Sequence, residues 1–165
     1  MLEVAIDADA EWDSSTDWQA LARKAAESAV AESAFPQLAT GLRAVEISIR
    51  LTSDDEVRAL NEQWRGKDRP TNVLSFPMAE AAELQADDDR ELMLGDVVLA
   101  RGICAAEAEA KAIPVADHAA HLLVHGTLHL LGHDHQDDDS AARMEAREVR
   151  ALARLGIANP YEGAR

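Results

Sequence analysis

The chain has 165 residues, of which 47% are hydrophobic and 28% are charged, with only 8 glycines and 5 prolines. This size and composition indicate one globular domain over residues 1–165 and exclude a disordered, collagen-like or low-complexity chain. The formal net charge of −15 opposes unspecific attraction to phosphate backbones and to anionic membranes. Any function on nucleic acid must therefore come from local features.

Neither a membrane protein nor a secreted one is indicated by the sequence. No apolar run approaches the ~18 residues that a spanning helix needs, and the first residues lack a basic region followed by an apolar one. The single cysteine, Cys104, cannot form an internal disulfide, which suits a reducing compartment. We therefore expect a cytoplasmic protein without a membrane partner, in which Cys104 is a small buried side chain.

The N-terminal third predicts a strand, a helix and a second strand. Residues 2–7 alternate apolar and polar side chains, as a short strand does. Apolar residues then recur at helical spacing from Trp18 to about Ser33, and we expect Trp18 in the core. Strict alternation over residues 45–51 predicts a strand with one buried face and one solvated face.

The middle of the chain predicts a helix and two more strands. A serine followed by three acidic residues favours a helix over residues 53–66, in which Val57, Leu60, Asn61 and Trp64 share one face. Residues 72–76 and 94–99 are expected to be strands. The strongly acidic segment 80–91 between them is expected to be a solvated loop.

Three helices are expected in the C-terminal part, over residues 101–111, 115–131 and 140–155. Gly132 can adopt the left-handed conformation that ends the second of them, and residues 137–140 favour a cap for the third. We therefore expect a single α+β domain, with a small mixed sheet of about four strands packed with about five helices. Its central helix carries histidines.

All six histidines lie between positions 118 and 135. At about 100° per residue, His125 and His129 lie one turn apart on one helical face and can share one ion. Gly132 lets the chain turn back, which brings His135 toward the pair as a third nitrogen donor. Three neutral imidazoles leave one tetrahedral position open, as in catalytic zinc sites. We therefore predict one Zn²⁺ per chain, held by His125, His129 and His135.

Other residues near this cluster have different expected roles. We favour ordinary hydrogen-bonded helix residues, rather than metal ligands, for His118 and His121. Asp134 could orient a ligand imidazole from outside the coordination sphere. The spacing of the three predicted ligands matches that of the metzincin peptidases, but those enzymes carry a glutamate where this chain has Gly126. Because that general base is missing, a peptidase of that kind is not expected.

Arg65 belongs to a short segment with four of the chain's 16 cations, which are Arg58, Arg65, Lys67 and Arg69. At a helix end, its planar guanidinium could bind a phosphate and offset charge that develops beside a metal. The residue pattern by itself equally allows a surface arginine that satisfies the carbonyl groups at the end of the helix.

Three blocks of the chain share a pattern with a known family. Residues 125–135 read HGTLHLLGHDH, residues 61–77 read NEQWRGKDRPTNVLSFP, and residues 94–98 read LGDVV. Together they resemble the signature blocks of the YbeY family of bacterial, single-domain, metal-dependent endoribonucleases. At position 133 that family often has an aromatic residue such as tyrosine. We expect His133 to take the place of the aromatic residue rather than to compete for the metal.

The resemblance implies that His125, His129 and His135 are the metal ligands and that Arg65 is the functionally required arginine. It also implies single-strand cleavage in ribosomal RNA maturation, notably at the 3′ end of the small-subunit (16S) RNA, and a role in ribosome quality control. The partners would then be ribosomal RNA and ribosomal or small-subunit proteins. No DNA partner is expected.

Two other functions stay open from the residues alone. Three histidines do not specify the bond that is cleaved, so the protein could be a metallohydrolase on another substrate, such as a peptide or a small amide. It could also be a ribosome-associated binding module with a structural metal, although the open fourth coordination position argues against this.

Overall fold

Four strands and seven helices make up the part of the chain that the structure describes. The structure is a computed structural model that describes residues 1–162, so the last three residues of the expected 1–165 domain lie outside the described range. The elements are β1 (Leu2–Ala8), α1 (Trp18–Ala31), α2 (Gln37–Thr40), β2 (Val45–Thr52), α3 (Asp54–Arg65), β3 (Val73–Pro77), α4 (Ala81–Gln85), β4 (Leu92–Ala100), α5 (Arg101–Ala110), α6 (Val115–Leu130) and α7 (Asp138–Arg154).

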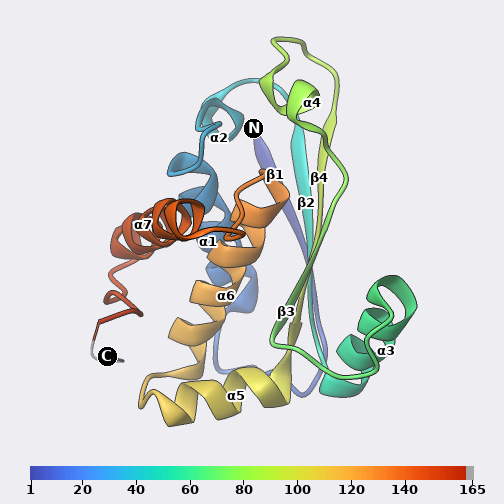
Figure 1. Cartoon of the computed structure of the whole chain (residues 1–165), viewed down its shortest axis with the longest axis vertical. Helices are drawn as coiled ribbons and strands as arrows, with labels where there is room; N and C mark the ends of the chain where they lie inside the picture. The colour runs from blue at the N-terminus through green and yellow to red at the C-terminus, as the bar shows by residue number, and fades with distance from the viewer. Residues whose placement is uncertain (163–165) are drawn as a thin grey trace.

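The strands form one mixed sheet in the order β1-β2-β4-β3 (Figure 1). β1 pairs with β2 and β2 with β4 in parallel, whereas β3 lies antiparallel to β4 at the edge of the sheet. In this register Ser75 of β3 lies opposite Val97 of β4. The α+β class, the single domain and the four-stranded mixed sheet confirm the fold expected from the sequence.

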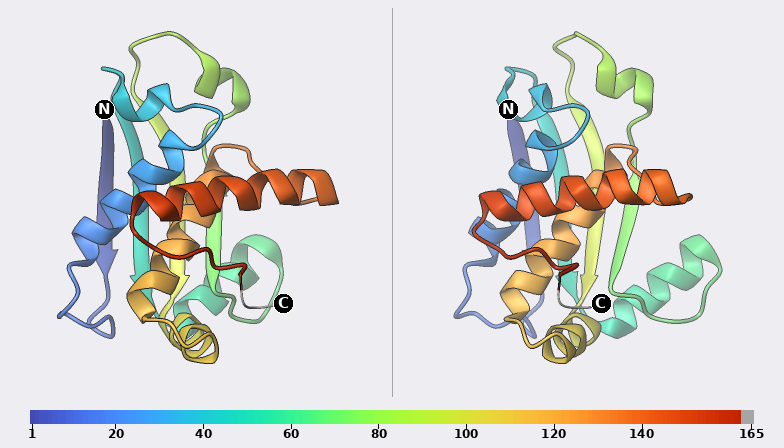
Figure 2. Two further views of the ribbon diagram at one scale, coloured as in Figure 1. Left: turned by 90° about the vertical axis from the view of Figure 1, so that its left-hand side faces the viewer. Right: turned by 60° about the vertical axis from the view of Figure 1, so that its left-hand side comes forward.

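Helices α1 and α6 cover one face of the sheet, α7 packs on the outer side of these two helices, and α3 lies on the other side of the sheet near β3 (Figures 1 and 2). The central helix is α6, in which eleven of the 16 residues are buried. Its apolar side chains join those of α1, α7 and the sheet in the main core. A smaller cluster under α3 contains Val57, Leu74 and Val98. The histidine-bearing helix is therefore held on several sides.

A glycine brings the C-terminal half of α6 close to the sheet. A Cβ atom on Gly126 would lie 2.7 Å from Val97 Cγ1, 3.1 Å from Ser75 Oγ and 3.3 Å from Val73 Cγ2. The Ser75 hydroxyl also donates a hydrogen bond of 3.2 Å to the Gly126 carbonyl. Because a core packed this closely has no space for an added methyl group, Gly126 fixes how near the helix lies to β3 and β4.

The acidic segment 80–91 is not entirely the solvated loop that its composition predicts. It contains α4, whose first turn is closed by reciprocal hydrogen bonds between Glu80 and Glu83. Leu84 is only 2% exposed and belongs to the main core. The expectation failed because a single apolar residue, once buried, is enough to hold a capped turn within a run of acids.

Trp64 lies on the predicted helical stripe, which it shares with the buried Val57 and Asn61, but its own side chain is 65% exposed.

Trp18 and Cys104 are buried as expected, and burial raises the pKa of the Cys104 thiol to about 12. Asp137 caps α7, as predicted, with its side chain accepting from the Ser140 N–H. Among the described helices, none is long and apolar enough to cross a membrane.

Candidate metal centre

Three histidines converge at the C-terminal end of α6. His125 and His129 lie one turn apart on the helix, and His135 lies on the loop that follows Gly132. Each contributes one ring nitrogen, and these nitrogens all lie within 4.8 Å of one another. Gly132 has a φ of 88°, the left-handed conformation that lets the chain reverse direction after the helix. The cluster could therefore hold a metal ion.

The protonation state of His129 suits a cation. Burial, and next the neighbouring His125 and His135, lowers the pKa of His129 to about 4. His129 is therefore neutral near pH 7 and has a free nitrogen lone pair. The Nε2 atoms of His125 and His129 are 3.1 Å apart, so both ring edges face the same small volume. Three imidazole nitrogens are a donor set that Zn²⁺ and several other divalent metals accept.

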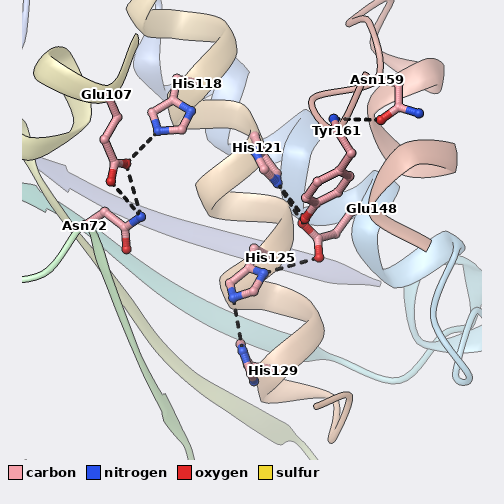
Figure 3. A network of polar contacts seen from close by, with 9 residues as sticks. All are labelled: Asn72, Glu107, His118, His121, His125, His129, Glu148, Asn159 and Tyr161. Atoms are coloured by element: carbon pink, nitrogen blue, oxygen red, sulfur yellow. Dashed lines mark hydrogen bonds and ion pairs between the residues drawn. The ribbon is translucent and has the colours of Figure 1, made fainter. Parts of the chain in front are cut away.

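Glu148 of α7 holds His125 from behind the cluster (Figure 3). Its carboxylate is 1% exposed. It accepts hydrogen bonds from His121 Nε2 at 2.7 Å, from the Tyr161 hydroxyl at 2.7 Å and from His125 Nδ1 at 3.3 Å. Burial by itself raises the pKa of Glu148, but these hydrogen bonds and the nearby His125 outweigh it and lower the pKa to about 2.

An ionised carboxylate can only accept hydrogen bonds, so the Nδ1 atom of His125 that faces Glu148 carries a proton. The Nε2 lone pair then faces His129 and is available to a cation. Carboxylates that fix a ligand imidazole in this way commonly support metal sites. The sequence analysis missed Glu148, although one signal was present: its spacing of four residues from both Met144 and Leu152 places a lone acid on the buried stripe of α7.

Replacing Glu148 with glutamine is expected to weaken metal binding roughly 10- to 100-fold, because the amide cannot hold all three donors and no longer fixes the His125 tautomer. Competition with a chelator of known affinity measures this change. The matched control is Glu145→Gln on the same helix, which should bind metal like the wild type. Thermal melting of each variant reports whether the fold survives. Equal metal affinity in a folded Glu148→Gln variant would contradict the assigned role.

Arg65 opens onto the same cleft as the three histidines. This cleft has a volume of about 590 Å³ and lies between α6, β3 and the loop that carries His135. Arg65 reaches it from the last turn of α3, and its Nη2 donates a hydrogen bond of 3.1 Å to the Ser75 carbonyl of β3. The carbonyl groups of Asn61 and Glu62 at the end of α3 accept instead from the Gly66 N–H. Arg65 is therefore directed toward the cleft.

The remaining histidines lie outside the three-nitrogen cluster. His118 Nε2 bonds to Glu107 at 2.8 Å, which confirms the ordinary hydrogen-bonded role expected for it. His121 is also hydrogen-bonded, but its partner is Glu148, so it contacts the metal centre indirectly. His133 Nε2 accepts from the Ala34 N–H at 3.2 Å, so this nitrogen faces the segment that follows α1 rather than the cluster.

The role considered for Asp134 was wrong. Its carboxylate accepts from the backbone N–H of His135 at 2.7 Å and therefore orders the ligand loop rather than an imidazole ring. The sequence could not show this because the conformation of the loop decides which donor the short side chain reaches. The imidazole partner is Glu148, which comes from another helix.

Position 126 has no space for a glutamate general base. The close approach of Val97, Ser75 and Val73 leaves this position to glycine. The difference from the metzincin pattern thus has a structural cause, since a larger residue there would push α6 away from the sheet. The helix presents its histidines, and not an acid, to the cleft.

Comparison with known proteins shows to which family this chain belongs. The family model described as Endoribonuclease YbeY matches residues 5–156. The chain belongs to the YbeY family. Its YbeY relatives include an Endoribonuclease YbeY of Rhizorhabdus wittichii, 52% identical over 164 residues that cover 98% of this chain and 97% of that protein. Another, of Sphingopyxis alaskensis, is 53% identical over 164 residues, 98% of each chain.

The resemblance found in the three sequence blocks is thus confirmed, and with it the membership of an endoribonuclease family. A solution structure of a Thermotoga maritima protein has a similar fold. It is similar with a TM-score of 0.55 at 22% identity, covering 94% of this chain and 92% of that one. At that identity the similarity concerns the fold alone.

Proposed function

We propose that this protein is a metal-dependent endoribonuclease that cleaves single-stranded RNA in ribosomal RNA maturation, with the 3′ end of the small-subunit RNA as its target. The observation that carries the proposal is the shared cleft, in which three imidazoles that could hold a metal face the guanidinium of Arg65. Membership of the endoribonuclease family supports the reaction class. The proposed location is the cytoplasm, where ribosomes are assembled.

In the proposed site, His125, His129 and His135 hold one Zn²⁺ per chain. The bound ion supplies a Lewis acid beside the scissile phosphate. Glu148 keeps the proton of His125 on Nδ1, so that Nε2 faces inward. Burial keeps His129 neutral, because the charged form of its imidazole would lose hydration there.

Arg65 is proposed to bind the scissile phosphate. One of its five N–H donors is used by the Ser75 carbonyl, which fixes the guanidinium at the edge of β3. The other donors can bind two phosphate oxygens at once. As negative charge grows on those oxygens in the transition state, donors that are already in place stabilise it without rearrangement.

The net charge of −15 bears on the partners. Such a chain is repelled by free RNA except where cations gather, so affinity should come partly from other contacts. We therefore propose that ribosomal or small-subunit proteins present the RNA to the cleft, which would also place the enzyme in ribosome quality control.

The test is a substrate panel with metal-loaded and chelator-treated protein. It contains a small-subunit RNA precursor with an extended 3′ end, both free and in assembled subunits, and a set of peptides and small amides. We expect cleavage of the precursor by the loaded protein only, and faster cleavage in subunits. Peptide or amide cleavage that His129→Ala abolishes, without RNA cleavage, would favour the other metallohydrolase. Subunit binding without any hydrolysis by loaded protein would favour a binding module.

A further inference from the structure

Trp64 is an exposed aromatic residue at the end of α3, beside the proposed active site. The other two tryptophans, Trp12 and Trp18, are 3% and 8% exposed, whereas Trp64 is 65% exposed. The last turn of α3 projects away from the sheet beyond the edge strand β3 (Figures 1 and 2). The helical stripe is buried at Val57, near the start of the helix, but at Trp64 it extends beyond the sheet. The indole has no apolar layer to pack on.

The segment around Trp64 contains three cations without a salt-bridge partner among the described residues. Within the described residues, Arg65, Lys67 and Arg69 form no salt bridge, and all three are exposed. Arg58, by contrast, pairs with Asp68 at 2.6 Å. In a chain of net charge −15, three unpaired cations within five residues form a local site for an anion. We call Trp64, Arg65, Lys67 and Arg69 the α3 patch.

The α3 patch adjoins the cleft through Arg65, which is the member of the patch that lines it. Trp64 is the residue before Arg65 in the last turn of α3, and Lys67 and Arg69 follow within four residues. An RNA strand whose phosphate is bound at Arg65 can therefore reach the patch with a neighbouring nucleotide. Aromatic side chains next to cations are the usual means by which proteins hold unpaired bases, because every base offers a flat ring to an indole.

We propose that Trp64 stacks on an unpaired base of the single-stranded RNA, next to the cleaved position, while Lys67 and Arg69 bind the flanking phosphates. The choice of RNA as the occupant rests on the proposed function and on the charge of the patch. A duplex would not fit this role, since its bases are already stacked on one another. The patch would thus select single strands before cleavage takes place.

Tryptophan fluorescence tests the stacking directly, because Trp64 is the exposed indole and Trp12 and Trp18 are buried. The probe is a fully 2′-O-methylated adenosine decamer, added at low salt to metal-loaded protein. We expect the single strand to quench the fluorescence, and a duplex of the decamer with its complement to leave it unchanged. The quenching should disappear in Trp64→Phe. Quenching that persists in this variant would come from the buried tryptophans and would overturn the proposal.

The affinity of a dye-labelled decamer gives the second measurement. Trp64→Ala should bind about 5- to 150-fold more weakly, and Trp64→Phe, which keeps a flat ring, should be close to wild type. The matched control is Leu42→Ala, which removes another exposed apolar side chain and should change nothing. Thermal melting confirms that the variants fold. Wild-type affinity in Trp64→Ala would overturn the proposal, and if that variant then fails to bind subunits, Trp64 contacts a protein instead.

These readouts separate this inference from the proposed function. Quenching and loss of affinity without RNA cleavage would leave the stacking site in place and reject the nuclease assignment. Cleavage of the precursor at the wild-type rate and KM by Trp64→Ala would support the nuclease assignment and reject the stacking site.

Discussion

Replacing His129 with alanine is expected to remove the metal and the RNA cleavage together. His129 is half-buried, neutral near pH 7 and in contact with His125, and its loss leaves the cluster with two donors instead of three. Two imidazoles do not complete a catalytic zinc site. Metal content, measured by elemental mass spectrometry, should fall from about one ion per chain to near zero. Cleavage of the small-subunit RNA precursor by the same samples should fall to the level of metal-stripped protein.

The matched control for this experiment is His133→Ala. His133 lies near the ligand loop and lines the cleft, but its Nε2 is occupied by the Ala34 N–H. This variant should keep its metal and its activity, apart from a small loss of stability. Two results would contradict the proposed ligand set: one ion per chain in His129→Ala, or loss of the ion in His133→Ala.

Replacing Arg65 with alanine is expected to reduce cleavage roughly 10²- to 10³-fold while the metal stays bound. Arg65 is exposed, and its described hydrogen bond is a single one to Ser75, so neither the fold nor the histidine cluster depends on it. If Arg65 stabilises charge that develops in the transition state, the loss appears mainly in kcat rather than in KM. Single-turnover cleavage of the RNA precursor, together with metal content and thermal melting, measures all three properties.

Two further variants sharpen the test of Arg65. Arg65→Lys keeps the charge but not the planar fork, so it should recover only part of the activity. Arg58→Ala removes a cation from the same helix that is already paired with Asp68, and it should cleave at nearly the wild-type rate. Unchanged cleavage in Arg65→Ala would reject its role in the reaction. Loss of metal in that variant would instead place Arg65 in the support of the cluster.

The metal cluster could be predicted from the sequence because its geometry is mostly local. A helix puts His125 and His129 on one face whatever surrounds it, and a left-handed glycine three residues later returns the chain toward that face. The strand over residues 45–51 and the central helix over residues 115–131 followed from periodicity in the same way. These features depend on neighbours within a few residues, so short patterns are sufficient to predict them.

The position of α3 on the sheet could be seen only in the tertiary structure. Helical spacing placed Trp64 on the apolar stripe, but whether a stripe is covered depends on where the neighbouring sheet ends. Because β3 is the edge strand, the stripe continues past it and the indole stays exposed. The same arrangement turns Arg65 toward Ser75 and the cleft. From the residue pattern, this orientation and that of a surface arginine were equally compatible with the sequence.

The role of Glu148 in the site also could not be predicted from the sequence. The sequence by itself determined the family, the four strands, the five longer helices and the three-histidine cluster, all of which follow from short-range patterns. It did not determine that a carboxylate on α7 holds His125, because the two residues are 23 positions apart and meet only when α7 packs on α6. Contacts of this range depend on how whole elements pack, and only the folded chain brings Glu148, Arg65 and the histidines to one place.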